Sequence, residues 1–111
     1  MQASRPAAKS SLSPARTRLV GLMQRLNFGR IEELRILDGE PLFDPPPLAI
    51  REHKFARGDG PRPEAAKADF ALKAEVIDLF DQLESLGDGV ITRIEIQHGL
   101  PFRMVVEEVL A

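Results

Sequence analysis

The chain has 111 residues, a formal net charge of −2 and no cysteine. This length is typical of one domain and is sufficient to bury a single core. Without cysteine there is no disulfide, no thiol nucleophile and no cysteine-based zinc site, and we expect a protein of the reducing cytoplasm. No apolar run approaches the roughly 20 residues that span a bilayer, so we expect no membrane segment.

The basic residues are unevenly distributed along the chain. Residues 1–31 hold six basic side chains and no acidic one, which leaves nine basic and seventeen acidic side chains in the remainder. Such asymmetry is found in nucleic-acid-binding arms and also in solvated tails, and both interpretations stay open. The candidate binding residues of the structured part of this region are Arg16, Arg18 and Arg25.

The first 12 residues are rich in Ala and Ser, which predicts a disordered basic tail, and residues 13–111 are predicted to form one domain. The first helix is expected to begin at Ser13, a good N-cap, with Pro14 in the first helical position. It is expected to end at Asn27, which tolerates the left-handed conformation. Its apolar stripe comprises Leu19, Val20, Met23 and Leu26.

Two stretches predict β-hairpins. One is "IEELRILDGEPLF" (residues 31–43) with Asp-Gly at its turn, and the other is "ITRIEIQHGLPFRMVVEEVL" (residues 91–110) with His-Gly at its turn. Gly39 and Gly99 are expected to supply the positive φ that such turns require.

Two registers fit each hairpin, one with a two-residue turn and one with a three-residue loop that closes in a left-handed glycine. The second is favoured because it gives the sheet a continuous apolar face, with Ile94 opposite Phe102. Pro41 and Pro101 donate no hydrogen bond from the outgoing strands, which predicts that these strands lie at the sheet edges.

The segment between the hairpins is interrupted by prolines and glycines. Residues 48–55 are compatible with an extended strand, and residues 56–68 are predicted to be a Pro/Gly-rich connector. A second helix is predicted from an N-cap at Asp69 to Gly87. Its apolar stripe comprises Leu72, Val76, Leu79, Phe80, Leu83 and Leu86.

The two helix–hairpin segments align without gaps at an offset of 60 residues. The identities are Leu19/Leu79, Leu26/Leu86, Gly29/Gly89, Ile31/Ile91, Ile36/Ile96, Gly39/Gly99 and Pro41/Pro101. They favour an internal duplication with units at residues 13–55 and 69–110, although two unrelated helix–hairpins with ordinary turn residues remain the alternative. The predicted fold is α+β: a duplicated α-β-β unit that forms a four-stranded antiparallel sheet with two helices on one face.

The stretch "LVGLMQRLNFGRIEELRILDGEPLF" (residues 19–43) resembles a family of short bacterial proteins of unknown function. The family pattern runs helix, aromatic-Gly, strand, Asp-Gly, strand, and here it falls on Phe28-Gly29 and Asp38-Gly39. The second unit departs from it, with Asp in the aromatic slot and His in the Asp slot. The resemblance implies a fold unit and a bacterial origin, and it implies no activity.

The sequence contains no recognisable motif for catalysis. It has no glycine-rich phosphate loop, no nucleophile elbow and no metal-binding histidine spacing, since its only histidines are His53 and His98. We therefore expect no catalytic residue, no cofactor and no metal, and a small non-enzymatic binding or assembly module. Homo-oligomers through the edge strands or the uncovered sheet face are expected, while an enzyme site between subunits remains the alternative.

Arg93 and Arg103 are the candidate binding residues of the second hairpin. In the favoured register they lie opposite each other on the sheet face away from the helices, together with Ile91 and Val105. Arginines with apolar neighbours indicate a surface for nucleic acid or for a partner sheet, and a mixed solvated face is the ordinary alternative. Nucleic-acid binding by this face and the basic tail is the second functional hypothesis. A local function is expected where the two units differ, for example at His98.

Overall fold

The structure, a computed structural model, describes residues 12–53, 55 and 73–107. The predictions of a disordered tail before Leu12 and of a connector at residues 56–68 lie outside these residues. The elements in chain order are α1 (Pro14–Leu26), β1 (Gly29–Leu37), β2 (Glu40–Leu42), β3 (Leu48–Arg51), α2 (Ala74–Leu86), β4 (Gly89–Gln97) and β5 (Leu100–Val105).

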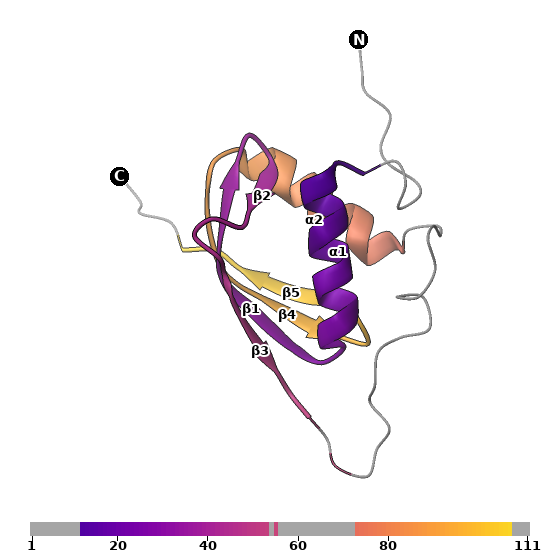
Figure 1. Cartoon of the computed structure of the whole chain (residues 1–111). Helices are drawn as coiled ribbons and strands as arrows, with labels where there is room; N and C mark the ends of the chain where they lie inside the picture. Colours follow the sequence, from indigo (N-terminus) through magenta and orange to yellow (C-terminus); the bar gives the residue numbers. More distant parts are fainter. Residues whose placement is uncertain (1–11, 54, 56–72, 108–111) are drawn as a thin grey trace.

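One antiparallel sheet carries both helices on the same face (Figure 1). The strand order is β2-β1-β4-β5, and β3 pairs with β1 on the side that β2 also occupies. The predicted α+β class is confirmed. The predicted four strands are too few, because residues 48–51 add a fifth strand by pairing with residues 29–32. The outgoing strands that contain Pro41 and Pro101 lie at the two ends of the strand order, as predicted.

Helix α1 begins and ends where the sequence predicts. The Ser13 hydroxyl oxygen accepts a hydrogen bond of 3.2 Å from the Arg16 N–H, which satisfies one of the unpaired donors of the first turn. At the other end Asn27 has a φ of 63°, and its N–H donates to the Met23 carbonyl. The left-handed residue thereby stops the helix and satisfies one of its last carbonyls.

Helix α2 begins later than predicted. Its N-cap is Lys73, whose side chain makes no capping hydrogen bond, and the predicted cap Asp69 lies outside the described residues. The first buried side chain of the helix is Val76. Packing on the sheet, more than a capping side chain, therefore stabilises this first turn. At the C-terminal end Gly87 has a φ of 73°, as the sequence predicts.

The inner face of the sheet and the stripes of the two helices form one hydrophobic core. Its buried members are Leu19, Val20, Met23, Leu26, Ile31, Leu34, Ile36, Val76, Leu79, Phe80, Leu83, Ile91, Ile94 and Ile96. The predicted stripes of both helices are confirmed within the described residues. Removal of these aliphatic side chains from water is the main favourable term that holds the helices on the sheet.

The two central strands do not alternate strictly between the faces of the sheet. In β1 both Ile31 and Leu34 are buried, and in β4 both Ile91 and Ile94 are buried, so the inward positions are three residues apart. Glu33, between the first two, has a φ of 58°, which breaks the alternation. The prediction that Ile91 shares the uncovered face with Arg93 and Arg103 is therefore wrong, because it assumed an unbroken period of two.

Both hairpins have two-residue turns. Leu37 pairs with Glu40 in the first, and Gln97 pairs with Leu100 in the second. All four turn residues have positive φ, which defines the turn favoured by the twist of the strands; they are Asp38 (53°), Gly39 (75°), His98 (55°) and Gly99 (75°).

The preference for a three-residue loop is therefore wrong. The register shift of the second hairpin falls further along the ladder, between Glu95 and Ile96. Because of this shift, Ile96 pairs with Pro101 while Ile94 pairs with Met104. The apolar inner face that motivated the longer loop is still formed, but a bulge inside the ladder produces it.

Gly29 and Gly89 occupy corresponding positions at the starts of β1 and β4, with φ angles of 152° and 159°. A Cβ at Gly29 would lie 2.0 Å from the carbonyl oxygen of Ile50 in β3. A Cβ at Gly89 would come no closer than 3.4 Å to the Leu86 side chain. The missing side chain at Gly29 therefore permits the close approach of β3 to β1.

We expect Gly29→Ala to lower the free energy of unfolding by about 1–3 kcal/mol more than Gly89→Ala. Both substitutions carry a similar backbone cost, but only the first forces the β3 backbone to move. Urea denaturation followed by circular dichroism would measure the difference. Equal losses in the two variants would mean that β3 pairing does not depend on this approach.

Candidate interaction surface

The sheet face that points away from the helices, called the outer face from here on, is crossed by two rows of side chains. Residues directly opposite each other on antiparallel strands project from the same face, so the register defines each row. The first row is Leu48, Glu32, Arg93 and Val105, and the second row is Ile50, Arg30, Glu95 and Arg103. In each row the two middle residues carry opposite charges.

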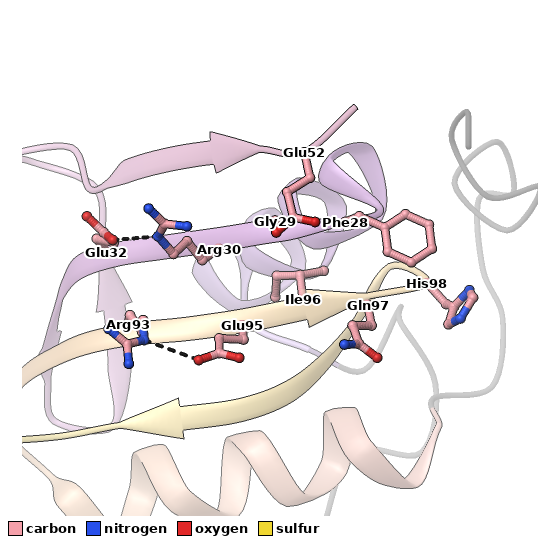
Figure 2. A pocket seen from close by; sticks show the side chains of 10 residues that line it. All are labelled: Phe28, Gly29, Arg30, Glu32, Glu52, Arg93, Glu95, Ile96, Gln97 and His98. Atoms are coloured by element: carbon pink, nitrogen blue, oxygen red, sulfur yellow. Dashed lines mark hydrogen bonds and ion pairs between the residues drawn. The ribbon is translucent and has the colours of Figure 1, made fainter. Parts of the chain in front are cut away.

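These middle residues, Arg30, Glu32, Arg93 and Glu95, form a square of alternating charge that we call the charged square (Figure 2). Along β1, the Arg30 Nε donates to the Glu32 Oε2 at 2.7 Å. Along β4, the Arg93 Nε donates to the Glu95 Oε2 at 3.2 Å. Each guanidinium is therefore oriented by a carboxylate two residues along its own strand, and the four charges cancel.

Arg103 is attached to the charged square through Glu95. The Nη2 of Arg103 lies 3.3 Å from the Oε1 of Glu95, and the two residues are partners across β4 and β5. The prediction that Arg93 lies opposite Arg103 is wrong, since Arg93 pairs with Val105. The incorrect loop length displaced the partner by one pair, but both arginines do lie on the outer face.

A hollow of about 550 Å³ lies over the charged square. Phe28, Gln97 and His98 border one end of it, and Glu52, which follows β3, borders one side (Figure 2). The rings of Phe28 and His98 meet edge to face, with centroids 4.8 Å apart. The volume is that of a ligand pocket. Since charged and amide groups dominate the lining, the hollow suits a polar or charged group better than an apolar one.

Each hairpin turn contacts the end of the helix that belongs to the other half of the chain. The Gly39 N–H donates to the Gly87 carbonyl at 2.8 Å, and the Gly99 N–H donates to the Asn27 carbonyl at 2.9 Å. The two contacts are reciprocal, because the residue numbers in each differ by 60 from those in the other. The hairpin turns therefore satisfy carbonyls at the helix ends that the helices themselves leave unpaired.

The residues that follow the helix ends extend these contacts in two different ways. In one place the Asp88 Oδ1 accepts a hydrogen bond of 2.7 Å from the Asp38 N–H. In the corresponding place the ring of Phe28 meets the ring of His98. In the sequence, Asp88 and His98 look like two unrelated departures from the first unit. The structure brings each changed residue against the partner that accommodates it, a pairing that sequence reasoning missed.

The outer face also carries exposed aliphatic side chains. Leu48, at one end of the first row, is 56% exposed. Val90, opposite Arg35, is 39% exposed. Exposed aliphatic groups beside an internally neutralised set of charges are typical of surfaces that contact other proteins.

Arg16, a predicted binding residue, is buried inside the fold and is not a surface arginine. Its Nη2 donates to the Gly39 carbonyl at 3.0 Å, and its Nη1 pairs with Glu84 at 3.2 Å. Its Nε lies 3.3 Å from a carboxylate oxygen of Glu40, and its guanidinium stands over the ring of Phe80. Arg16 therefore links α1, the first turn and α2, and the spacing of α1 residues alone gave no sign of this role.

Arg18 and Arg25 are exposed on α1, on the helix side of the sheet. The guanidinium of Arg18 stands 4.3 Å from the ring centroid of Phe43, and the Arg25 carbonyl accepts a hydrogen bond from Arg51. The fold does not bring these two arginines together with Arg93 and Arg103, which lie on the opposite face. The predicted binding residues therefore do not form one continuous basic surface.

Within residues 12–53, 55 and 73–107, no three His, Asp or Glu side chains are grouped so that they could hold a metal ion. No helix in this part of the chain is long and apolar enough to cross a membrane. Comparisons with family models, with curated proteins and with solved structures found no match to this chain. The function of the outer face is therefore inferred from its geometry.

Arg16→Leu is expected to lower the free energy of unfolding by about 1–3 kcal/mol, because it leaves the buried Gly39 carbonyl without its donor and breaks two ion pairs. Arg18→Leu, on the exposed side of the same helix, should cost less than about 1 kcal/mol. Urea denaturation of both variants would measure these costs. A negligible cost at Arg16 would return it to the set of available binding residues.

Proposed function

We propose that this protein is a small binding or assembly module that acts without catalysis and contacts its partner through the outer face of the sheet. The charged square is the observation that carries the proposal. Its arginines are already oriented by carboxylates, so the surface offers a fixed set of charges with no net repulsion of another protein. Leu48 and Val90 beside it supply aliphatic area that a partner can cover.

The arrangement of the helices supports the same proposal. Both helices pack on the inner face, and no described element covers the outer face (Figure 1). A solvated face is ordinary for an antiparallel sheet, and such a face is normally polar throughout. The exposed leucine and valine depart from that pattern, and they favour a covered surface over a solvated one.

Nucleic-acid binding remains a separate proposal with weaker support. Arg93 and Arg103 both pair with Glu95, so a phosphate would have to compete with a carboxylate that the fold holds in place. This alternative expects binding that weakens with salt and with deletion of residues 1–12. Salt-sensitive binding of DNA or RNA to the intact chain would favour it.

We also infer that the domain is a duplication of one α-β-β unit. The two helices have the same length and begin 60 residues apart, as do β1 and β4. The pairing of β1 with β4 is unchanged when the two units are exchanged, since Gly29 pairs with Ile96 and Ile36 pairs with Gly89. The reciprocal contacts of the two hairpin turns have the same symmetry.

The remaining expectations belong to this proposal. The resemblance of residues 19–43 to short bacterial proteins fits a unit that closes its core against a second copy of itself. A cytoplasmic location is proposed from the absence of cysteine.

The charged square breaks the symmetry of the proposed duplication. The pair Arg30 and Glu95 corresponds, after exchange of the units, to Val90 and Arg35. The rim residue Glu52 follows β3, a strand for which the described part of the second unit has no counterpart. A feature confined to one half is not needed for the symmetric core, which supports a role in binding.

A photo-reactive amino acid placed on the outer face tests the proposal. We expect Val90→p-benzoylphenylalanine to give cross-linked products in cells, because this position would lie within or beside the covered surface. The matched control is the same amino acid at Glu75, which is exposed on α2. Gel shift and mass spectrometry of the products would measure cross-linking and identify the partner.

The proposal is overturned if Val90 gives no more product than Glu75. Products that contain nucleic acid in place of protein would favour the alternative. A second position, Leu48, guards against a local geometry that prevents the reaction at Val90.

A further inference from the structure

We infer that the partner of the outer face is a second copy of this chain, which stacks its own outer face on the first to form a two-fold dimer. The inference rests on the proposed function, because it names the partner of the same surface. The two rows of the outer face carry it, since each row is complementary to its own reverse.

The symmetry of the proposed dimer follows from the order of the strands. A two-fold axis parallel to β1 and β4, midway between them, stacks β1 of one copy on β4 of the other and leaves each row on its own level. This is the aligned packing that sheets commonly adopt. β3 of one copy then stacks on β5 of the other, because these strands flank the central pair.

The charges match under this operation. Arg30 of one copy faces Glu95 of the second copy, and Glu32 faces Arg93 of the second copy. All four corners of the charged square therefore meet an opposite charge, and the two-fold axis repeats each contact. Charge complementarity of this kind mainly fixes the orientation of a complex and excludes wrong partners, and it adds less to affinity.

The ends of the first row match as well. Leu48 of one copy faces Val105 of the second copy, so two aliphatic contacts flank the charges. In the second row Ile50 faces Arg103 of the second copy, whose alkyl stem can cover an aliphatic side chain. The aliphatic contacts supply the hydrophobic part of the association that ion pairs do not provide.

The sheet edges offer a poorer route to the homo-oligomer that the sequence predicts. Pro41 in β2 and Pro101 in β5 cannot donate to an added strand, and β2 has only three residues. Short edges with proline are a common protection against edge-to-edge pairing. Assembly by face stacking therefore agrees better with the structure than assembly by edge strands.

The size of the outer face sets the expected strength of the dimer. Four strands about 4.8 Å apart and a central strand of nine residues give a face of roughly 20 Å by 30 Å, or about 600 Å² for each copy. Such a contact is at the low end of specific interfaces. The hollow over the square would hold water, as polar interfaces commonly do. We therefore expect a reversible dimer.

A charge-exchange experiment on the full chain tests the inference. Arg30→Glu and Glu95→Arg each place like charges across the proposed interface, so each variant alone should dimerise about tenfold more weakly than the wild type or worse. An equal mixture of the two should recover dimers, because the introduced glutamate of one variant then faces the introduced arginine of the other. Sedimentation equilibrium from about 10 µM to about 1 mM, the range suited to an interface of this size, would measure the three dissociation constants.

Glu75→Arg is the matched control, since it makes the same charge change as Glu95→Arg on the helix side of the molecule. It should dimerise as the wild type does. Circular dichroism would establish that each variant is folded. If either exchange variant fails to fold, the pair Glu32→Arg and Arg93→Glu repeats the experiment at the other two corners of the square.

A wild-type chain that stays monomeric over the whole range overturns the inference. A dimer that persists unchanged in the exchange variants, or a mixture that recovers nothing, also overturns it. These failures are distinct from failure of the proposed function. A monomer whose position 90 cross-links to another protein would leave the binding module intact and exclude only the second copy as its partner.

Discussion

The antiparallel pairing of β1 with β4 is the constraint on which the rest of the structure depends. Ile31 pairs with Ile94 and Leu34 pairs with Ile91, so four buried aliphatic side chains meet at the middle of the sheet. Every other described strand is attached to one of these two, and both helices cover the face that they line. A shift of one residue in this register would move each of these side chains to the opposite face.

The same pairing also creates the outer face. Both central strands depart from strict alternation at the same level, which sends Ile91 inward while Arg93 stays outward. With unbroken alternation these two residues would share a face, and the core would lose an isoleucine to solvent. The irregularity therefore completes the core on one side and groups the arginines with the glutamates on the other. Core packing and surface charge are two consequences of one register.

Contacts between the halves of the chain add to this pairing at both ends of the sheet. Each turn glycine donates to the last carbonyls of the distant helix, and the rings of Phe28 and His98 extend one of these contacts. Arg16 strengthens the other by joining the Gly39 carbonyl to Glu84 of α2. A single helix–hairpin could make none of these contacts, because each needs a residue from the other half.

The sequence by itself determined the features that depend on neighbouring residues: the start of α1 at Ser13, the helix stops at Asn27 and Gly87, the positive φ of the turn glycines and the helical stripes. Caps, turns and amphipathic periods are local, so a single sequence carries them. Tertiary structure alone decided the turn length, the fifth strand, the burial of Arg16 and the partners of Arg93. Each of these depends on which distant residues meet. Register and packing are set by the burial of the whole core, and no local pattern contains that information.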